Sequence, residues 1–469
     1  LSAVYHAHIA TGELHLRPVL NLKDTEDVKL FRIIAVETAK LVKKYRGSLS
    51  GEHGDGRLRG EFIPYMRGEK VYGLLKEIKN TWDPYNIFNP GKITDTPPMD
   101  KSLRYEQGAE TLSLNSYFDY KIELGMARAI EKCNGSADCR KSEIIGGTMC
   151  PSFMATRDEM HSTRGRANVL RELITKKGEV HWADQHEVME SLDLCLSCKA
   201  CKSECPSGVD ITKLKADFLQ NHYDANPTPF RSNLIAGFPR YMELAMKFQP
   251  LTGWAFRSKL ISPVIKYIAG FNVRRPMPSI SKYSLNSWYK KHDISTKALK
   301  GKVYLFNDEF VNNNESHIGV KAIMLLEKLG YEVVIPQHTY SGRTYLSKGL
   351  VRKAAALADK NVEMLKDIIS EETPLIGIEP SAILSFRDEY PQLVKSELKE
   401  AALKLSKNAL MFDEFIMREA EKGNISSDSF TTEVAEIKLH GHCHQKALAT
   451  TDTCKKMLEL PANYKVSEI

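Results

Sequence analysis

Hydrophobic and polar residues alternate with different periods along this chain, and each period predicts a different kind of element. Residues 4–17 are typical of a β-hairpin, whereas residues 26–46 repeat apolar side chains every 3.6 positions behind an acidic first turn, which predicts a helix. A second, shorter helix is predicted over 69–80, and a Pro-Pro pair then marks a boundary. The pattern therefore predicts a first mixed unit over residues 1–98.

Two further kinds of organisation follow. Residues 105–225 are helical segments interrupted by cysteine loops, and residues 226–300 are amphipathic pieces separated by prolines. Strands and helices alternate over residues 301–469, which predicts a doubly wound parallel α/β sheet. The predicted fold class is thus multidomain, combining α+β and α/β parts. Strands of the last part are expected at 302–306, 331–336, 374–380 and 436–442.

Composition narrows the class of protein. Of the 469 residues, 42% are apolar and 27% are charged, as in ordinary globular proteins. No stretch of 18 apolar residues and no signal-peptide pattern is visible, so a cytoplasmic protein is expected. The formal charge of +7 is spread along the chain without a run of five basic residues, which argues against a nucleic-acid partner. Because Leu1 is not an initiator methionine, we expect the chain to begin inside a longer protein.

The amphipathic, basic stretch 230–275 leaves two interpretations open. Such a stretch can lie on a bilayer surface, which would make the protein peripheral at the inner face of the membrane. Its prolines favour packing between domains instead. We expect interdomain packing and keep peripheral membrane contact as the alternative.

Seven of the nine cysteines fall between residues 133 and 205, which indicates metal binding. The last four have the spacing C-x2-C-x2-C-x3-C-P of a cubane iron–sulfur motif, in which the cysteine before proline ligates a second cluster. Three upstream cysteines form a degraded copy of this motif, with Ser136 in its middle position. A zinc site fits the spacing of the last four cysteines poorly. If the cysteine before proline in each motif ligates the cluster of the other motif, the sequence predicts one complete [4Fe–4S] site and one incomplete site. The complete site is expected to contain Cys150, Cys195, Cys198 and Cys201, and the incomplete site Cys133, Cys139 and Cys205.

The neighbours of these cysteines are less informative. Arg157, Arg164 and Arg166 follow the Cys150 loop, and the sequence leaves open whether they cap helices or act on a negative cluster. Cys443 lies among three histidines, where a core or loop cysteine is favoured over a metal ligand.

Histidines suggest a second metal site near the N-terminus. If Thr11-Gly12 is the two-residue turn of the hairpin, His8 lies directly opposite His15 on one face of the sheet. Two imidazoles so placed can bind one divalent ion, and Glu52 in the glycine-rich segment 50–56 offers a third ligand. A solvated polar face fits the spacing equally well.

The segments HAHIATGELHLRP, SLSGEHGDG and WDPYNIFNPGK resemble the C-terminal half of FAD-linked oxidases, specifically D-lactate and D-2-hydroxyglutarate dehydrogenases. The cysteine-rich segments resemble the iron–sulfur part that is fused to the long bacterial members. The resemblance implies that His8, His15 and Glu52 bind a divalent metal, Zn, Mn or Fe, that His53 is the catalytic base, and that Asn89 lies near the flavin.

The chain departs from these families in three places. The hairpin has Ala7, Ala10, Thr11 and Glu13 where Gly, Gly, Asp and Asn are common. The flavin-binding domain with its glycine-rich pyrophosphate loop has no counterpart, so we expect this chain to hold half of an active site. Residues 301–469 resemble a degenerate cysteine-rich (CCG) domain, in which residues 340–343 replace the Cys-Cys-Gly motif.

The resemblance implies the oxidation of a D-2-hydroxy acid by FAD, with electrons leaving through a [4Fe–4S] cluster to a quinone or an electron-carrier protein. The metal would chelate the substrate, His53 would accept its hydroxyl proton, and Arg17, Arg57 or Arg59 would bind a second carboxylate. The alternative is a non-catalytic iron–sulfur subunit that docks a separate flavoprotein. The sequence does not decide whether the protein forms an oligomer.

Overall fold

A computed structural model describes residues 2–108, 115–175, 185–293 and 300–469. The chain divides into two compact units. The first consists of residues 1–112 with 175–177, and the second of residues 113–174 with 178–469. The predicted boundaries within the second unit stay predictions.

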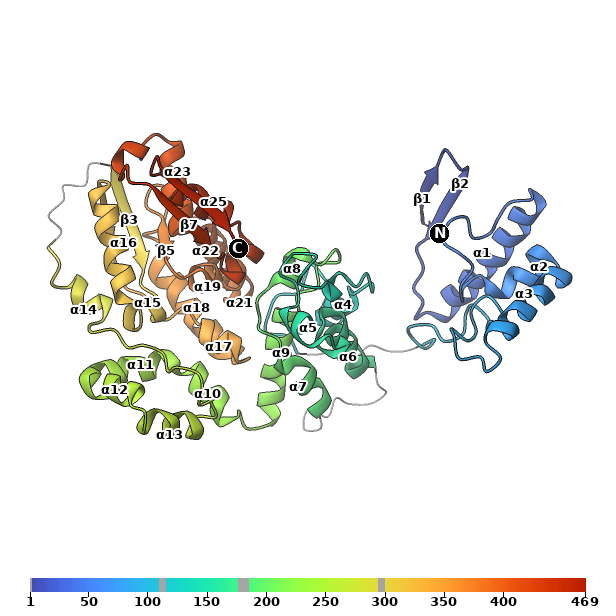
Figure 1. The fold of residues 1–469 in the computed structure, drawn as a ribbon, viewed down its shortest axis with the longest axis horizontal. Coiled ribbons are helices and arrows are strands. Elements are labelled where there is room, and N and C mark those ends of the chain that lie inside the picture. Colours follow the sequence, from blue (N-terminus) through green and yellow to red (C-terminus); the bar gives the residue numbers. More distant parts are fainter. Residues whose placement is uncertain (1, 109–114, 176–184, 294–299) are drawn as a thin grey trace. The chain divides into compact units, whose positions relative to one another are not determined.

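The first unit contains a hairpin and three helices (Figure 1). Its longest helix begins where predicted, because the Asp24 carboxylate accepts hydrogen bonds from the amides of Glu26 and Asp27 at 2.9 and 3.0 Å. Val28 and Ala39 lie on its buried face. The elements are β1 (Ala3–His8), β2 (Glu13–Pro18), α1 (Thr25–Lys44), α2 (Ile63–Arg67) and α3 (Glu69–Trp82).

The register of the hairpin differs from the prediction by two residues. His8 lies opposite Glu13 rather than opposite His15, and His6 lies opposite His15. The loop has four residues instead of two, because the amides of Thr11 and Gly12 both donate to the His8 carbonyl, at 3.3 and 2.9 Å. A shift of two residues equals one full side-chain period, so the predicted histidines still share a face of the sheet.

The second unit begins with helices that alternate with cysteine loops, as predicted. All of the clustered cysteines between Cys133 and Cys205 belong to, or pack against, one apolar core. A further group of helices follows from residue 230. These helices are α4 (Met126–Glu131), α5 (Pro151–Thr156), α6 (Thr163–Thr175), α7 (His186–Asp193), α8 (Ala200–Glu204), α9 (Ile211–Ala225), α10 (Phe230–Ala236), α11 (Phe238–Lys247), α12 (Gln249–Arg257), α13 (Ile261–Ile268) and α14 (Leu285–Tyr289).

A four-stranded parallel sheet forms the last part of the second unit, with strand order β4-β3-β5-β6. Neighbouring residues of β5 face opposite cores: Leu375 packs with Val362 of α18, and Ile376 packs with Phe415 of α23. The doubly wound prediction is therefore confirmed. The elements are β3 (Gly301–Phe306), α15 (Glu309–Asn313), α16 (Ser316–Lys328), β4 (Tyr331–Val334), α17 (Arg343–Ser347), α18 (Val351–Leu365), β5 (Leu375–Gly377), α19 (Pro380–Ile383), α20 (Ser385–Asp388), α21 (Tyr390–Leu393), α22 (Lys399–Lys407), β6 (Ala409–Met411), α23 (Phe412–Glu421), α24 (Cys443–Leu448) and α25 (Asp452–Leu458).

One predicted strand lies elsewhere. The strand expected at 436–442 is β7 (Ala435–Leu439), and it pairs with β8 (Tyr464–Glu468) in a separate two-stranded parallel sheet. Its residues alternate between exposed and half-buried, whereas all three residues of β5 are buried. A central parallel strand needs both faces buried, so the alternation of β7 excludes it from the main sheet. The short strand β6 takes the edge position instead.

A buried charge network joins the last cysteine loop to the α/β part of this unit. Lys199 forms ion pairs with Asp388 and Glu389, and Arg343 donates to Glu389 at 2.6 Å. Lys202 also pairs with Asp388. Burial acts to raise the pKa of Asp388, but the two ammonium groups hold that pKa well below its usual range.

Replacing Lys199 by Met is expected to lower the free energy of unfolding by about 1–3 kcal/mol, because Asp388 and Glu389 each lose one charged hydrogen-bond partner but keep Lys202 and Arg343. Since the pKa of Asp388 is depressed in the folded state, its contribution is present above about pH 4 and is lost as the pH falls. Urea unfolding of the full-length protein, followed by the visible absorption of its cluster, measures the change. The Lys404→Met control on the exposed side of α22 should match the parent, and a Lys199→Met variant that also matched would contradict the prediction.

Candidate metal centre and iron–sulfur loops

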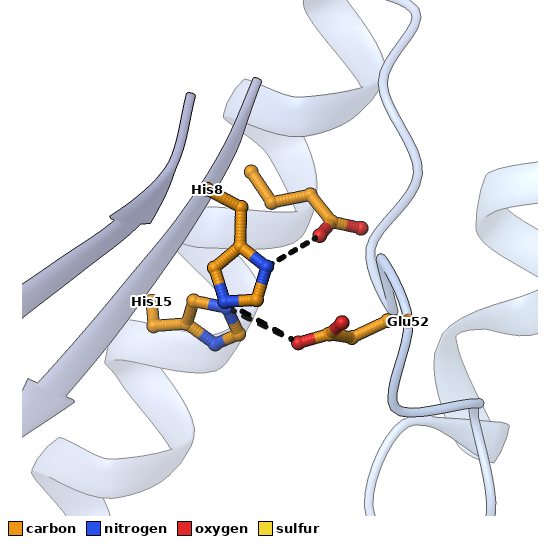
Figure 2. Close-up of side chains that lie close together, drawn as sticks. His8, His15 and Glu52 are labelled. Atoms are coloured by element: carbon orange, nitrogen blue, oxygen red, sulfur yellow. Dashed lines mark ion pairs between the residues drawn. The ribbon is translucent and has the colours of Figure 1, made fainter. Parts of the chain in front are cut away.

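The predicted metal ligands converge at the end of the hairpin. His8 and His15 project from the two strands toward Glu52 of the facing loop (Figure 2). Nε2 of each histidine lies 3.6 Å from Oε1 of Glu52, and the two imidazole rings are 4.7 Å apart. The structure thus brings together the three residues that the sequence proposed.

Glu13 is a fourth donor that the sequence analysis missed. Its Oε2 lies 3.7 Å from Nδ1 of His8, and one ligand atom from each of the four side chains lies within 4.8 Å of all the others. The assumed two-residue turn placed Glu13 beside the turn and away from His8. The observed register, in which His8 pairs with Glu13, is the signal that would have identified it.

A glycine allows the two acidic side chains to approach each other. Gly51 has φ of +48°, and a Cβ at this position would lie 2.7 Å from Oε1 of Glu13. Any other residue would collide with the Glu13 carboxylate or strain the loop. The SGEHG segment therefore places Glu52 directly against the hairpin.

The donor set fits a divalent metal. Nε2 of His15 is shielded from solvent and has no hydrogen-bond partner in the described part of the chain. A buried imidazole nitrogen without a partner is costly, and a cation among two imidazoles and two carboxylates would satisfy it. Glu52 and His8 are each 47% exposed, so the site stays open to a small ligand.

His53 lies beside the predicted metal ligands but is not one of the four side chains that could hold the metal. Its Nε2 is 3.5 Å from Oε1 of Glu52, and its ring packs edge-on against His15 at 5.1 Å. Arg59 donates to the Gly54 carbonyl at 3.0 Å and so holds the loop, whereas Arg17 and Arg57 are exposed.

The loop before Asn89 is built around a buried carboxylate. Asp83 accepts hydrogen bonds from the amides of Ile87 and Phe88, each at 2.8 Å, and pairs with Lys79. This anchoring turns the chain sharply, and Asn89 itself is exposed with φ of +48°. The WDPYNIFNPGK segment therefore presents Asn89 at the surface of the first unit.

The cysteines of the second unit lie in loops that are shaped to wrap a cluster. Cys150, Ser197 and Lys199 all have positive φ values, of 60°, 55° and 66°. Burial raises the pKa of the Cys198 thiol to about 11 and also raises the pKa of Cys201. Because burial disfavours the thiolate, these cysteines can bind iron only with the cation directly beside them.

Several of these thiols lie close enough to influence one another's pKa. The charges of Cys195, Cys443 and Cys150 all raise the pKa of Cys198. Cys139 interacts with Cys133 of the predicted incomplete site, and also with Cys150. The assignment of each cysteine to one cluster stays a prediction.

The arginines that the sequence left open now have distinct positions. The Arg164 amide donates to Sγ of Cys139 at 3.3 Å, and the buried Arg166 guanidinium lies 3.9 Å from Sγ of Cys150. Arg157 instead pairs with Glu143 at the surface. Donors directed at sulfur favour a negatively charged cluster, so two of the three arginine positions face the cysteines.

Cys443 lies close to the cluster loops, which the sequence analysis missed. Its thiol interacts electrostatically with Cys198, and Nε2 of the adjacent His444 lies 3.0 Å from the Ser197 carbonyl. Burial, and then the charge of Arg343, lower the pKa of His444 to about 2, so the neutral ring donates to that carbonyl. The α/β part thus holds the last cysteine loop in place.

Two family comparisons define the class of the protein. Residues 1–93 match the C-terminal domain of FAD linked oxidases, and residues 132–210 match the 4Fe-4S dicluster domain. The chain therefore carries one domain of an FAD-linked oxidase and one 4Fe-4S domain, as the resemblance implied. FAD and an iron–sulfur cluster are the cofactors of these domains, whereas the divalent metal stays a prediction.

Individual relatives are more specific. The chain is 28% identical to D-2-hydroxyglutarate dehydrogenase of Pantoea ananatis over 84% of its own length and 42% of that protein. It is 26% identical to the Escherichia coli protein of the same name, over 94% of the chain and 46% of the relative. It is 27% identical to the Pseudomonas putida protein of that name, over 82% of the chain and 42% of the relative. The chain spans less than half the length of these curated relatives. No solved structure matches it significantly.

Proposed function

We propose that this chain is part of an FAD- and iron–sulfur-dependent D-2-hydroxy-acid dehydrogenase with D-2-hydroxyglutarate as its substrate. The observation that carries the proposal is the convergence of His8, His15 and Glu52, with His53 only 3.5 Å from the same carboxylate oxygen. The names of the dehydrogenase relatives supply the substrate class.

In this proposal His8, His15, Glu52 and Glu13 hold a divalent metal, which supplies Lewis-acid polarisation of the substrate hydroxyl when bound. Nε2 of His53 accepts the hydroxyl proton, because this imidazole nitrogen lies beside the ligand set and can act as a general base. The exposed Arg57 is a candidate for the second carboxylate of the substrate.

The flavin is proposed to face the surface around Asn89. Trp82, Tyr85 and Phe88 flank this residue and are 82%, 84% and 67% exposed, a large apolar area for the surface of one unit. FAD supplies hydride acceptance when bound. The cysteine loops then carry electrons one at a time to an acceptor, a quinone or an electron-carrier protein, in a cytoplasmic enzyme that contacts the membrane peripherally.

Dye-linked turnover of the full-length protein tests the proposal. D-2-Hydroxyglutarate, D-lactate and D-malate are compared, and the first is expected to give the highest kcat/KM. A chelator should abolish turnover, and Mn²⁺ or Zn²⁺ should restore it. Failure to oxidise any of the three acids, together with electron uptake from a separate flavoprotein, would instead establish the non-catalytic electron-transfer role.

Replacing Glu13 by Gln is expected to weaken metal binding roughly tenfold, because the amide keeps the shape of the side chain but loses its charge. Metal titration of the full-length apoprotein followed by calorimetry measures the affinity. Glu26→Gln is a matched control, since Glu26 pairs with the exposed Lys29 on α1 and is not among the predicted ligands. Equal affinities of the Glu13→Gln variant and the parent would exclude Glu13 from the metal site.

A further inference from the structure

Helices α10–α13 pack on the rest of the second unit by one side only. α10 contacts α17, α11 contacts α15, and each of these four helices contacts the next along the chain. Met242 and Ala245 form the buried side of α11. These contacts use only part of the apolar surface of the four helices.

α13 is oriented with its apolar side outward. Its buried residues include Ser262 and Lys266, which are only 5% and 8% exposed, and Nζ of Lys266 donates to the Val273 carbonyl at 3.2 Å. Tyr267 and Ile268 on the other side are 81% and 67% exposed. A helix that buries its polar residues and exposes its apolar ones needs a cover for the exposed side, because that side loses the benefit of burial.

α12 and the N-terminal end of α13 extend this surface. Leu251 and Trp254 are spaced i, i+3, and Leu260 and Val264 are spaced i, i+4, so each pair follows one side of its helix. All four side chains are more than half exposed. The α12–α13 face is defined here by Leu251, Trp254, Leu260, Val264, Tyr267 and Ile268.

The segment that contains this face has a net positive charge. Residues 230–275 contain eight Lys and Arg residues and one acidic residue, Glu243, so their formal charge equals the +7 of the whole chain. Arg257 is the last residue of α12, Lys259 lies between α12 and α13, and Arg274 and Arg275 follow α13; all four are exposed. The basic residues are dispersed in sequence, which is why a search for basic runs does not reveal them.

We propose that the α12–α13 face docks on an anionic lipid bilayer. Exposed aromatic and aliphatic side chains within a basic rim have the composition of an interfacial membrane surface, in which apolar groups enter the headgroup region and basic residues pair with lipid phosphates. Among the described residues, no helix is long and apolar enough to cross a membrane. The proposed contact is peripheral. It specifies the surface and the lipid class for the membrane contact in the proposed function, on which it rests.

Vesicle flotation of the full-length protein tests this proposal. Binding is expected to phosphatidylcholine vesicles that contain phosphatidylglycerol, and not to phosphatidylcholine alone, and it should weaken with salt. Arg257→Gln with Lys259→Gln is expected to weaken binding roughly 30-fold, since each basic residue near an anionic surface contributes about 1 kcal/mol. Leu260→Ser with Tyr267→Ser should weaken it at least tenfold at any salt concentration. Brominated lipid should quench the fluorescence of Trp254.

Matched controls carry the same chemistry elsewhere. Lys404→Gln with Lys407→Gln removes two exposed charges from α22, and Ile122→Ser removes an apolar side chain that is 94% exposed; both should bind like the parent. Binding that is unaffected by changes on the α12–α13 face would overturn the proposal. So would a dimer that these changes dissociate, or absence of vesicle binding. Dye-linked turnover is measured on the same preparations, so loss of docking and failure of the proposed reaction are distinguished.

Discussion

Replacing Glu52 by Gln in the full-length protein is expected to remove the divalent metal and to lower D-2-hydroxyglutarate turnover by a factor of at least about 100. Glu52 is the shared centre of the site, because its Oε1 lies within 3.6 Å of nitrogens from His8, His15 and His53. The glutamine amide lacks the negative charge of the Glu52 carboxylate, which the three imidazole rings face. Metal analysis of the purified variant, beside turnover with a dye acceptor, measures both losses.

His53→Asn separates proton transfer from metal binding. This variant is expected to keep its metal and to lose turnover by about 10²–10⁴-fold, the usual contribution of a general base. His8→Ala and His15→Ala should lose both. Unchanged metal content in the Glu52, His8 and His15 variants would exclude the proposed ligand set, and loss of metal from His53→Asn would make His53 a ligand rather than a base.

The sequence predicts the three residues that converge at the site, but it does not predict the register of the hairpin that positions two of them. The sequence predicts that His8 and His15 share one face of the hairpin. This prediction holds although the register is wrong, because a shift of two residues leaves every side chain on the same side of the strand. Glu13 was missed because of that same error. Its distance from His8 depends on the length of the loop, and Thr11-Gly12 is compatible with both a two-residue and a four-residue connection.

The strands of the α/β part differ in how well the sequence predicts them. The sequence predicts β3 and β4 because each strand is itself a clear apolar run. β6 has only three residues between two helices, too few to produce a period. The sequence analysis does not predict β8, and it expects the partner strand β7 in the main sheet because β7 continues the alternation of strands and helices.

The contact between the segment around Cys443 and the cysteine loops could not be predicted from the sequence. The closeness of Cys443 to Cys198, and the hydrogen bond from His444 to the Ser197 carbonyl, join residues that are about 245 positions apart. No local period records such a contact. Even so, the lone cysteine in the segment His440–His444 is now a neighbour of the cluster loops rather than part of a remote core.

Iron and sulfide analysis of the anaerobically purified full-length protein is expected to give about four atoms of each, the content of one cubane. Ser136 occupies the middle position of the upstream motif, and it is exposed, whereas Cys133 and Cys139 on either side are buried. A serine oxygen must lose a proton of far higher pKa than a thiol and is a harder ligand, so it holds iron less readily. The incomplete site is therefore expected to be empty.

Two cysteine variants turn this count into a test of ligand assignment. Cys198→Ala is expected to lose all of the iron and all electron transfer to the external acceptor, because Cys198 is the middle cysteine of the C-x2-C-x2-C segment that is predicted to hold the complete site. Cys205→Ala is the matched control, since it removes a thiol from the incomplete site and should keep about four iron atoms. Eight iron atoms in the parent, falling to about four in Cys205→Ala, would show instead that Ser136 or another residue completes a second cluster, in keeping with the dicluster family that residues 132–210 match.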